Sequence, residues 1–287
     1  MAKGNIGNLL QHFVALRCGE ALLGHWNQPH IPVAYIDCYS MAPWEEVTGK
    51  SSQGFDAIIR RFPVKAQSGD RVAATFLFAW HRRYSPTQLP PHPRDRDYPN
   101  TAVLLRTAFP DQTWEMRLHD IDKQSVLEEW IAEQPPGFGA VHGDWSQSPL
   151  IRNAPVSATQ AVFVMLDPNQ IVADDNAKAD SGFYLPDRML RFLIGQHGVD
   201  LLDRPSQPGA APAVVTLFSY SDGDPTTADR IVTDRFAPAG WSVERVRSGP
   251  WKTFGKDSFH IGWVVSCHLK TPLVPPSLQS AWDGWVA

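Results

Sequence analysis

The sequence lacks the features that would mark a secreted or membrane protein. Among its 287 residues are three widely separated cysteines, Cys18, Cys38 and Cys267, which cannot form a disulfide framework or a zinc-binding spacing. No apolar run approaches the roughly 18 residues of a membrane-spanning helix, and the N-terminus has no charged-then-apolar signal pattern. We therefore expect a protein of the reducing cytoplasm that neither is secreted nor crosses a membrane.

Several chemical signatures are also missing. There is no glycine-rich phosphate loop, which argues against a nucleoside triphosphate site of that type. His119, His142 and His260 do not show the spacing of a metal-binding pair, so we expect no metal. No serine lies in a nucleophile-elbow pattern, and the cysteines have no evident base partner. The formal net charge of −4 argues against polyanion binding by the whole surface.

The most informative segment is a hydrophobic stretch that stops at a polar turn. Residues 161–166 are all apolar and too few for a free-standing helix, which favours a strand covered on both faces. Pro168 cannot donate a hydrogen bond within a sheet, so the strand should end near Asp167. Asp167, Asn169 and Gln170 then form a candidate catalytic cluster at a strand end, where ligands bind in open α/β sheets. The alternative is a turn in which Asp167 caps the next segment.

Helical and strand patterns alternate along most of the chain. This alternation predicts an α/β fold with a mainly parallel central sheet and an antiparallel C-terminal edge. Helices are expected over residues 6–23, 101–108, 122–132, 186–194 and 225–236. Strands are expected over residues 32–37, 113–119, 140–142, 161–166, 213–219, 241–247 and 259–268. A turn over residues 38–43 should follow the first strand.

Residues 44–97 have a different character from the rest of the chain. Between Arg60 and Asp97, eight Lys or Arg residues stand against three acids, although the whole chain is acidic. We therefore expect an inserted basic subdomain at 44–97 within a main domain formed by 1–43 and 98–287. Arginines interspersed with aromatic residues are typical of single-stranded nucleic-acid binding, and the alternative is a solvated basic face. The candidate RNA- or DNA-binding residues are Arg60, Arg61, Arg82 and Arg83.

Five short motifs follow one another along the chain. They are Gly-Asn-Ile-Gly-Asn-Leu-Leu-Gln-His over residues 4–12, Tyr-Ile-Asp-Cys-Tyr-Ser-Met-Ala-Pro over 35–43, Tyr-Pro-Asn-Thr-Ala over 98–102, Arg-Leu-His over 117–119 and Asp-Pro-Asn-Gln over 167–170. Their order resembles that of the adenine methyltransferases of large-subunit ribosomal RNA, the RlmJ family, over nearly the whole chain. The resemblance implies a Rossmann-like fold that binds S-adenosylmethionine (SAM). The cofactor-binding residues that it implies are His12, Asp37, Tyr39, Asp120 and Asp144.

Each implied cofactor residue also has a structural alternative. The segment from Asp37 could be an ordinary exit from a strand, and His12 could be a structural histidine. An acid after the second strand commonly holds ribose hydroxyls, so we assign Asp120 to ribose and Asp122 to capping the next helix. Asp144 could accept a hydrogen bond from an adenine amine or cap a turn.

The chain departs from the family pattern at positions that carry chemistry. Met41 and Pro43 stand where the family has cofactor-loop glycines, and Gln11 stands where it has a helix lysine. Gln170 stands where it has the tyrosine that stacks on a flipped base. The resemblance implies SAM-dependent methylation of an amine, such as adenine in RNA or DNA, with Asp167 orienting the amine. The alternatives are a binding module without cofactor, for nucleic acid or a protein partner, and an enzyme acting on a small molecule.

Overall fold

Two fully buried strands form the centre of the protein. The computed structural model describes residues 6–28, 30–46, 72, 75, 97–120, 126–179, 183–221, 225–248, 251–253, 256–269 and 278–286. Strands β1 (Val33–Ser40) and β6 (Val162–Leu166) pair in parallel, and every residue of both is buried. Their nearly continuous apolar sequences suit strands that are covered on both faces.

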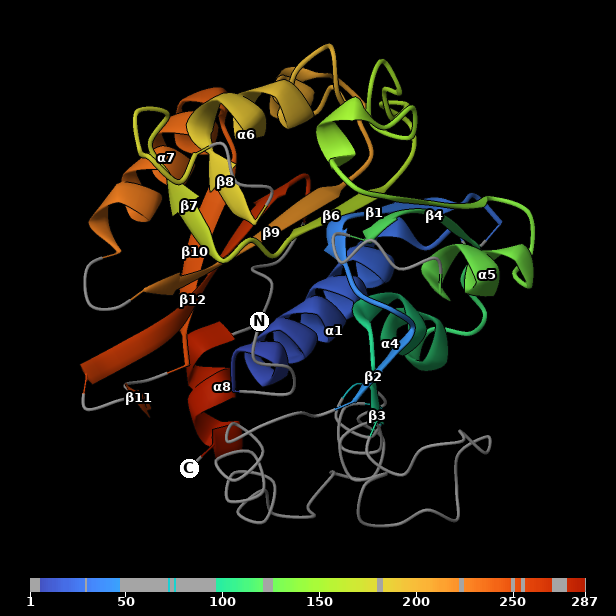
Figure 1. Cartoon of the computed structure of the whole chain (residues 1–287). Helices are drawn as coiled ribbons and strands as arrows, with labels where there is room; N and C mark the ends of the chain where they lie inside the picture. The colour runs from blue at the N-terminus through green and yellow to red at the C-terminus, as the bar shows by residue number, and fades with distance from the viewer. Residues whose placement is uncertain are drawn as a thin grey trace.

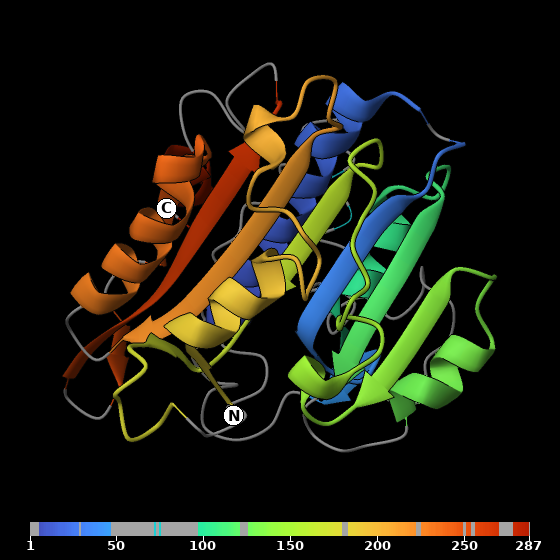
Figure 2. The same cartoon turned by 90° about the horizontal axis from the view of Figure 1, so that it is seen from above.

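The main sheet has eight strands within the described residues. Its neighbour order is β10-β12-β9-β6-β1-β4-β5, with β11 paired to β12 (Figure 2). The further strands are β4 (Trp114–Asp120), β5 (Phe138–His142), β9 (Ala213–Ser221), β10 (Ser242–Arg247), β11 (Trp251–Thr253) and β12 (Lys256–Cys267). The five strands from β9 to β5 are parallel, whereas β12 is antiparallel to both of its neighbours in this order. The predicted antiparallel C-terminal edge is therefore confirmed.

The chain visits the strands in doubly wound order. From β1 it moves outwards to β4 and β5, and it then crosses to β6 and β9 on the other side. The direction reverses between β1 and β6, and ligands bind at such switch points beyond the carboxyl ends of the strands. With antiparallel β12 inserted between β9 and β10, this is the Rossmann-like methyltransferase fold that the sequence predicts.

Helices cover both faces of the sheet (Figure 1). Helices α1 (Ile6–Trp26), α4 (Thr101–Ala108) and α8 (Leu278–Val286) contribute to one core, and α6 (Asp187–Ile194) and α7 (Thr226–Phe236) to the other. Helix α5 (Val126–Ala132) packs beside β5. Alternate residues of β1 divide between the two cores: Tyr35 belongs to the α1 core and Ile36 to the α6–α7 core. This alternation fixes which side chains of the central strands can reach α1.

Helix α1 is more deeply buried than α4 and α8, which contribute to the same core. It packs against α4, α8, β6, β9 and β12. Apolar side chains cover most of its circumference, as expected of a helix enclosed by protein. The side chains with no exposed surface include Leu9, Leu10, Phe13, Val14, Leu16 and Leu22.

Short elements connect the larger ones. Strands β2 (Trp44–Glu46) and β3 (Asp97–Pro99) pair antiparallel, and β7 (Gln170–Val172) and β8 (Tyr184–Pro186) pair in parallel. Three short 3₁₀ helices are η1 (Trp145–Gln147), η2 (Arg204–Ser206) and η3 (Ala237–Ala239). The two ends of the predicted insertion therefore meet as neighbouring strands. Most of that segment, including Arg60, Arg61, Arg82 and Arg83, lies outside the described residues, so the domain division stays a prediction.

The predicted elements occur with adjusted ends. The first strand continues to Ser40, past the expected end at Asp37, because β4 keeps pairing with it through Ser40 and Asp120 after a register shift. The predicted turn over residues 38–43 therefore begins only after Ser40. Strands β2, β3, β7 and β8 and helix α8 were not predicted. A three-residue strand is too short to show a periodicity.

The described residues contain neither a helix suited to spanning a membrane nor a cluster of metal ligands. Within the described ranges, none of the helices combines the length and apolar character needed to cross a bilayer. In the same part of the chain, no three His, Cys, Asp or Glu side chains come together as metal ligands would. Cys18, Cys38 and Cys267 are buried free thiols.

Gly7 gives a test of how closely α1 packs on the sheet. A Cβ at Gly7 would lie 2.2 Å from Nδ1 of His260 in β12, so the helix or the ring would have to move. Gly7→Ala should therefore lower the free energy of unfolding by about 1–3 kcal/mol. Gly24→Ala is the matched control, because its Cβ meets nothing within 4 Å; it should be neutral or stabilising by up to about 1 kcal/mol. Urea denaturation giving equal stability for both variants would contradict this packing argument.

Candidate functional site

The carboxyl ends of β1 and β6 bring Asp37 and Asp167 together. Asp37 pairs in register with Met165, and Asp167 follows Met165 by two residues. The side chain of Asp37 is buried, and Asp167 is partly buried. Burial raises the pKa of Asp167, and the negative charge of Asp37 contributes to the same rise. Because β1 and β6 flank the switch point, these acids lie where an α/β sheet receives its ligand.

Asp37 is held by the strand that carries it. The hydroxyl of Tyr35 donates a hydrogen bond of 3.1 Å to one carboxylate oxygen, and the backbone N–H of Tyr39 donates one of 3.1 Å to the other. The Tyr35 hydroxyl also lies 3.4 Å from Sδ of Met165, which links β1 to β6 at this level. Burial raises the pKa of Asp37 to about 7, although both hydrogen bonds favour the ionised form.

Asp167 is held from the opposite layer, by helix α1. Nε2 of Gln11 donates a hydrogen bond of 2.5 Å to Oδ1 of Asp167, and Asn8 donates one of 3.1 Å to Oε1 of Gln11. Burial, with a smaller contribution from the charge of Asp37, raises the pKa of Asp167 to about 8. A primary amide orients the carboxylate but does not neutralise it. Gln11 therefore contacts the strand-end acid directly.

The two carboxylates have no basic partner among the residues that the structure describes. Neither Lys nor Arg contributes to the pKa of Asp37 or of Asp167, and neither acid forms an ion pair there. Two interacting buried acids cannot both ionise without a compensating positive charge, so near neutral pH they retain a proton or accept a cation. The site is therefore electrostatically suited to a positively charged ligand.

The residues after Asp167 are fixed mainly through their backbones. The N–H of Asn169 donates to the carbonyl of Phe183 (2.8 Å), and its carbonyl accepts from the N–H of Tyr220 (2.9 Å). Gln170 begins β7 and, with Tyr220 and residues near α7, lines a cavity of about 160 Å³. Neither Asp37 nor Asp167 lines this cavity. Of the three predicted catalytic residues, Asp167 is therefore the one that the structure brings against Asp37. The catalytic roles of all three stay predictions.

Tyr39 and Asp144 both have structural contacts. The Tyr39 ring is buried edge-to-face against Trp145, with 6.4 Å between ring centroids, and its hydroxyl donates to the carbonyl of Tyr184 at 3.4 Å. Asp144 is exposed and caps η1 by accepting from the N–H (2.9 Å) and the hydroxyl (2.8 Å) of Ser146. The capping alternative for Asp144 is thus confirmed, and its cofactor role stays a prediction.

Two buried histidines lie near these strands. His12 on α1 is buried, and burial lowers its pKa to about 3, so its ring is neutral at pH 7. His119 has no exposed surface, and neither of its ring nitrogens has a hydrogen-bond partner among the described residues. Burial lowers the pKa of His119 to about 4, against the opposing effect of the charge of Asp144. A neutral imidazole with its donor and its acceptor both unpaired is costly, which favours a ligand or a water at this position.

His119 was not among the candidate residues predicted from the sequence. It lies one residue before Asp120, at the end of β4, and Asp120 pairs with Ser40 of β1. The Arg-Leu-His motif is the signal that could have identified it. Asp122 lies outside the described residues.

Asn100 braces the loop that leaves β1. Its N–H donates to the carbonyl of Pro43 (2.9 Å), and Nδ2 donates to the carbonyl of Met41 (3.0 Å). Its Oδ1 accepts from the N–H of Val103 and so caps α4. The contacts of Asn100 therefore position the backbone of this loop.

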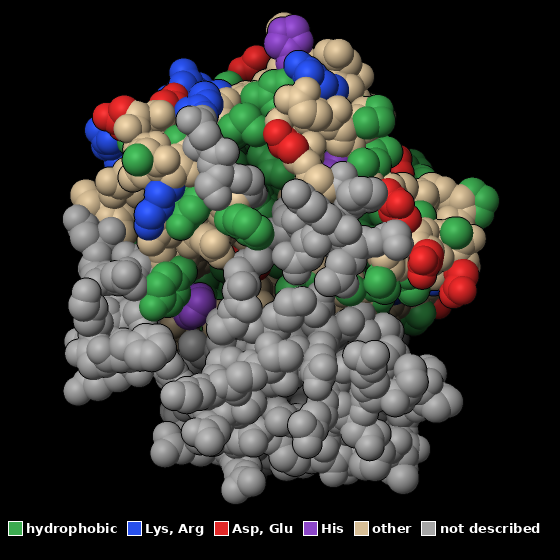
Figure 3. Space-filling view, in the orientation of Figure 1, with side chains coloured by type: hydrophobic (Ala, Val, Ile, Leu, Met, Phe, Trp, Pro, Cys, Tyr) green, Lys and Arg blue, Asp and Glu red, His purple; other side chains and the backbone are tan. Residues whose placement is uncertain are grey.

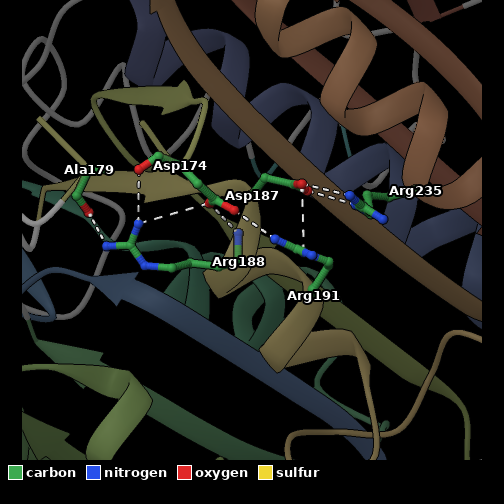
Figure 4. Close-up of polar contacts among 6 residues, drawn as sticks. All are labelled: Asp174, Ala179, Asp187, Arg188, Arg191 and Arg235. Atoms are coloured by element: carbon green, nitrogen blue, oxygen red, sulfur yellow. Dashed lines mark hydrogen bonds and ion pairs between the residues drawn. The ribbon is translucent and has the colours of Figure 1, made fainter. Parts of the chain in front are cut away.

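A network of ion pairs fixes the segment that returns from Asp167 to α6 (Figure 4). Asp174 accepts from Arg191 and from the backbone N–H of Arg188, both at 2.6 Å. Asp187 accepts two hydrogen bonds from the Arg235 guanidinium, at 2.7 and 2.6 Å, which hold the pKa of Asp187 below its usual value. Exposed pairs contribute little individually, but a two-pronged Arg–carboxylate pair imposes a geometry. Figure 3 shows acidic and basic side chains beside one another on the part of the surface where Figure 1 places α6 and α7.

Comparisons with known proteins place the fold. No protein-family model and no curated protein matches the chain. A Legionella pneumophila protein of the family labelled DUF519 has a similar structure, with TM-score 0.58 and 10% identity over 99% of this chain and 94% of that one. Two Pyrococcus horikoshii structures give lower scores. A candidate RNA methyltransferase has TM-score 0.34 and 14% identity over 86% of this chain and 81% of its own. TYW2 in complex with MeSAdo has TM-score 0.33 and 9% identity over 86% and 61%.

The strand order and the first of these likenesses define the fold. The chain has a methyltransferase-like fold of the Rossmann-like type, with two acids at its switch point.

The raised pKa of Asp167 makes stability depend on pH. Its pKa of about 8 exceeds that of an unfolded aspartate, so the folded protein favours the protonated form. Ionisation should therefore cost stability progressively as the pH rises from about 4 to about 8. Asp167→Asn removes this loss: the variant should be more stable than the wild type at pH 9 and similar to it at pH 4. Denaturation curves across this range measure the difference. Parallel curves for Asp167→Asn and the wild type would refute the prediction.

Proposed function

We propose that this protein is a SAM-dependent methyltransferase that acts on an amine. The observation that carries the proposal is the pair formed by Asp37 and Asp167, buried at the switch point without a basic partner among the described residues. SAM supplies the positive charge that such a pair lacks, through its sulfonium and its ammonium group. It also supplies the methyl group for the reaction.

The cofactor pocket that we propose extends over the carboxyl ends of β1 and β4. Asp37 and Asp120 end or nearly end these strands, and the unpaired nitrogens of His119 would gain partners from a nucleoside. His12, Tyr39 and Asp144 complete the predicted set. The orphaned imidazole and the uncompensated acids both fit a cofactor that offers hydrogen bonds and positive charge.

Asp167 would orient the nucleophile. Its ionised carboxylate accepts hydrogen bonds from an amine, and the hydrogen bond from Gln11 sets the direction in which the remaining lone pairs point. Asn169 and Gln170 would contact the same substrate. Methyl transfer depends mostly on alignment of the attacking nitrogen, the methyl carbon and the sulfur. The protonated form of Asp167 cannot accept in this way, so the rate should rise with pH as Asp167 ionises. A bound cation lowers the pKa of Asp167 and should move this rise to lower pH.

The substrate that we propose is adenine in RNA or DNA. The support is the motif order along the sequence, together with Arg60, Arg61, Arg82 and Arg83 in the basic insertion. Arginines can neutralise phosphates, and neighbouring aromatic residues can stack on bases.

Titration calorimetry with SAM tests the cofactor directly. Affinity should rise between pH 6 and pH 9, because ionised Asp37 and Asp167 attract the cation, and binding near pH 7 should release protons. Gln11→Lys places an ammonium group beside Asp167 and should weaken SAM binding roughly tenfold or more. Thr107→Lys adds the same charge on an exposed position of α4 and should leave the affinity unchanged. Absence of SAM binding at millimolar concentration would refute the proposed function, and wild-type affinity in Gln11→Lys would refute the charge argument.

A second candidate is a methyltransferase-like binding module that holds no cofactor. Met41 and Pro43 occupy the loop after β1, where the related family has glycines that allow close approach of a ligand. Such a module would still bind nucleic acid or a protein partner.

Binding of single-stranded RNA or DNA at increasing salt tests the basic insertion under either function. Affinity should fall as the salt concentration rises, because bound counterions are released from the nucleic acid. Arg82→Glu combined with Arg83→Glu should weaken binding strongly and reduce the salt dependence. The matched control is Arg152→Glu, which changes an exposed arginine of the main domain. Filter binding that is equal for the double variant and the wild type would exclude this surface.

A further inference from the structure

Phe183 is a large apolar side chain that remains exposed beside the candidate site. Its exposed fraction is 41%, and the other exposed large apolar residues among those described are Ile31 and Val126. Single exposed apolar residues are common on protein surfaces, so exposure alone indicates nothing. The position of Phe183 relative to Asp167 is what distinguishes it.

The backbone fixes Phe183 next to the turn that follows Asp167. Its carbonyl accepts from the N–H of Asn169 at 2.8 Å, and in the β7–β8 ladder the next residues, Gln170 and Tyr184, are partners. Asn169 is two residues from Asp167, a span of at most about 7 Å of extended chain. Figure 1 shows β7 and β8 side by side beneath α6. The backbones of Phe183 and Asp167 are therefore close in space, although 16 positions separate them in the sequence.

Contacts on both sides hold this arrangement. The hydroxyl of Tyr39 donates to the carbonyl of Tyr184, which ties β8 to the end of β1. On the other side, the ion pairs of Asp187 with Arg235 and Arg191 fix the start of α6, directly after β8. A ring placed on such a support loses little freedom when a ligand covers it.

The ring of Phe183 is also available for a ligand. Within the described ranges, no aromatic or cationic side chain contacts it, whereas the Tyr184 ring has the ammonium group of Lys178 at 5.3 Å from its centroid. Gln170 offers no ring at this place. A free aromatic surface next to an acid that can accept from an amine matches a flat heterocycle with an exocyclic amino group, because bases are held by stacking together with hydrogen bonds at their edges.

We propose that Phe183 forms the stacking surface for the substrate base whose amine Asp167 orients. The inference rests on the proposed function and deepens it. Phe183, the residue just before β8, then supplies the aromatic group that the turn after β6 lacks. This arrangement specifies a nucleobase, rather than an aliphatic amine, as the substrate class.

Fluorescence of 2-aminopurine tests the stacking surface without any need for turnover. A single-stranded oligonucleotide carries 2-aminopurine in place of one adenine, and its emission is followed on binding in the presence of S-adenosylhomocysteine. The wild type should change the emission, and Phe183→Ala should abolish that change and weaken binding on the order of ten- to a hundredfold. Phe183→Trp should retain both effects, because it keeps an aromatic face. Ile31→Ala removes a similarly exposed apolar side chain before β1 and should behave as the wild type.

The outcomes separate this inference from the proposed function. Either of two results overturns the inference even when SAM binds. One is that Phe183→Ala changes the 2-aminopurine emission as the wild type does, and the other is that the wild type does not change it. If the wild type fails to bind SAM in calorimetry, the proposed function fails, yet loss of the emission change in Phe183→Ala would still support the stacking surface. Calorimetry with SAM on Phe183→Ala should give wild-type affinity, and its loss would assign Phe183 a structural role and overturn the inference.

Discussion

Burial of the Asp37 and Asp167 carboxylates, without a basic partner among the described residues, is the constraint on which the rest of the site depends. Parallel pairing of β1 with β6 forces the two acids to the same edge of the sheet, and burial denies them the solvent that would screen their charges. The described residues supply hydrogen bonds but no positive charge. Such a pair lowers the stability of the folded protein, as unfavourable groups at functional sites commonly do.

Helix α1 orients the carboxylate of Asp167. Because the helix is enclosed by the sheet and by α4 and α8, Gln11 reaches Asp167 from a rigid support. An amide at this position orients the acid while leaving its charge available, whereas a lysine would satisfy it.

The sequence predicts the sheet better than it predicts the site. The apolar segment 161–166 and the position of Pro168 were sufficient to place Asp167 at a strand end, and the strand β6 confirms this. The contact of Asp167 with Gln11 joins residues 156 positions apart, and no local pattern can indicate it. The position of Phe183 likewise depends on β7 and β8, which are three residues long and have no periodicity to read. His119 was not predicted because an unpaired imidazole depends on the residues that surround it in the fold. A single sequence does not show those neighbours.

The antiparallel pairing of β2 with β3 has an architectural consequence. Trp44 lies opposite Pro99 and Glu46 opposite Asp97, so the chain enters and leaves the long insertion at one point. Asn100 closes this point by bonding to the backbone of Met41 and Pro43. The intervening segment is also anchored in the main domain, because Val72 is buried and belongs to the hydrophobic core that contains α1. The β2–β3 ladder and Val72 therefore couple this segment to the layer that carries Gln11.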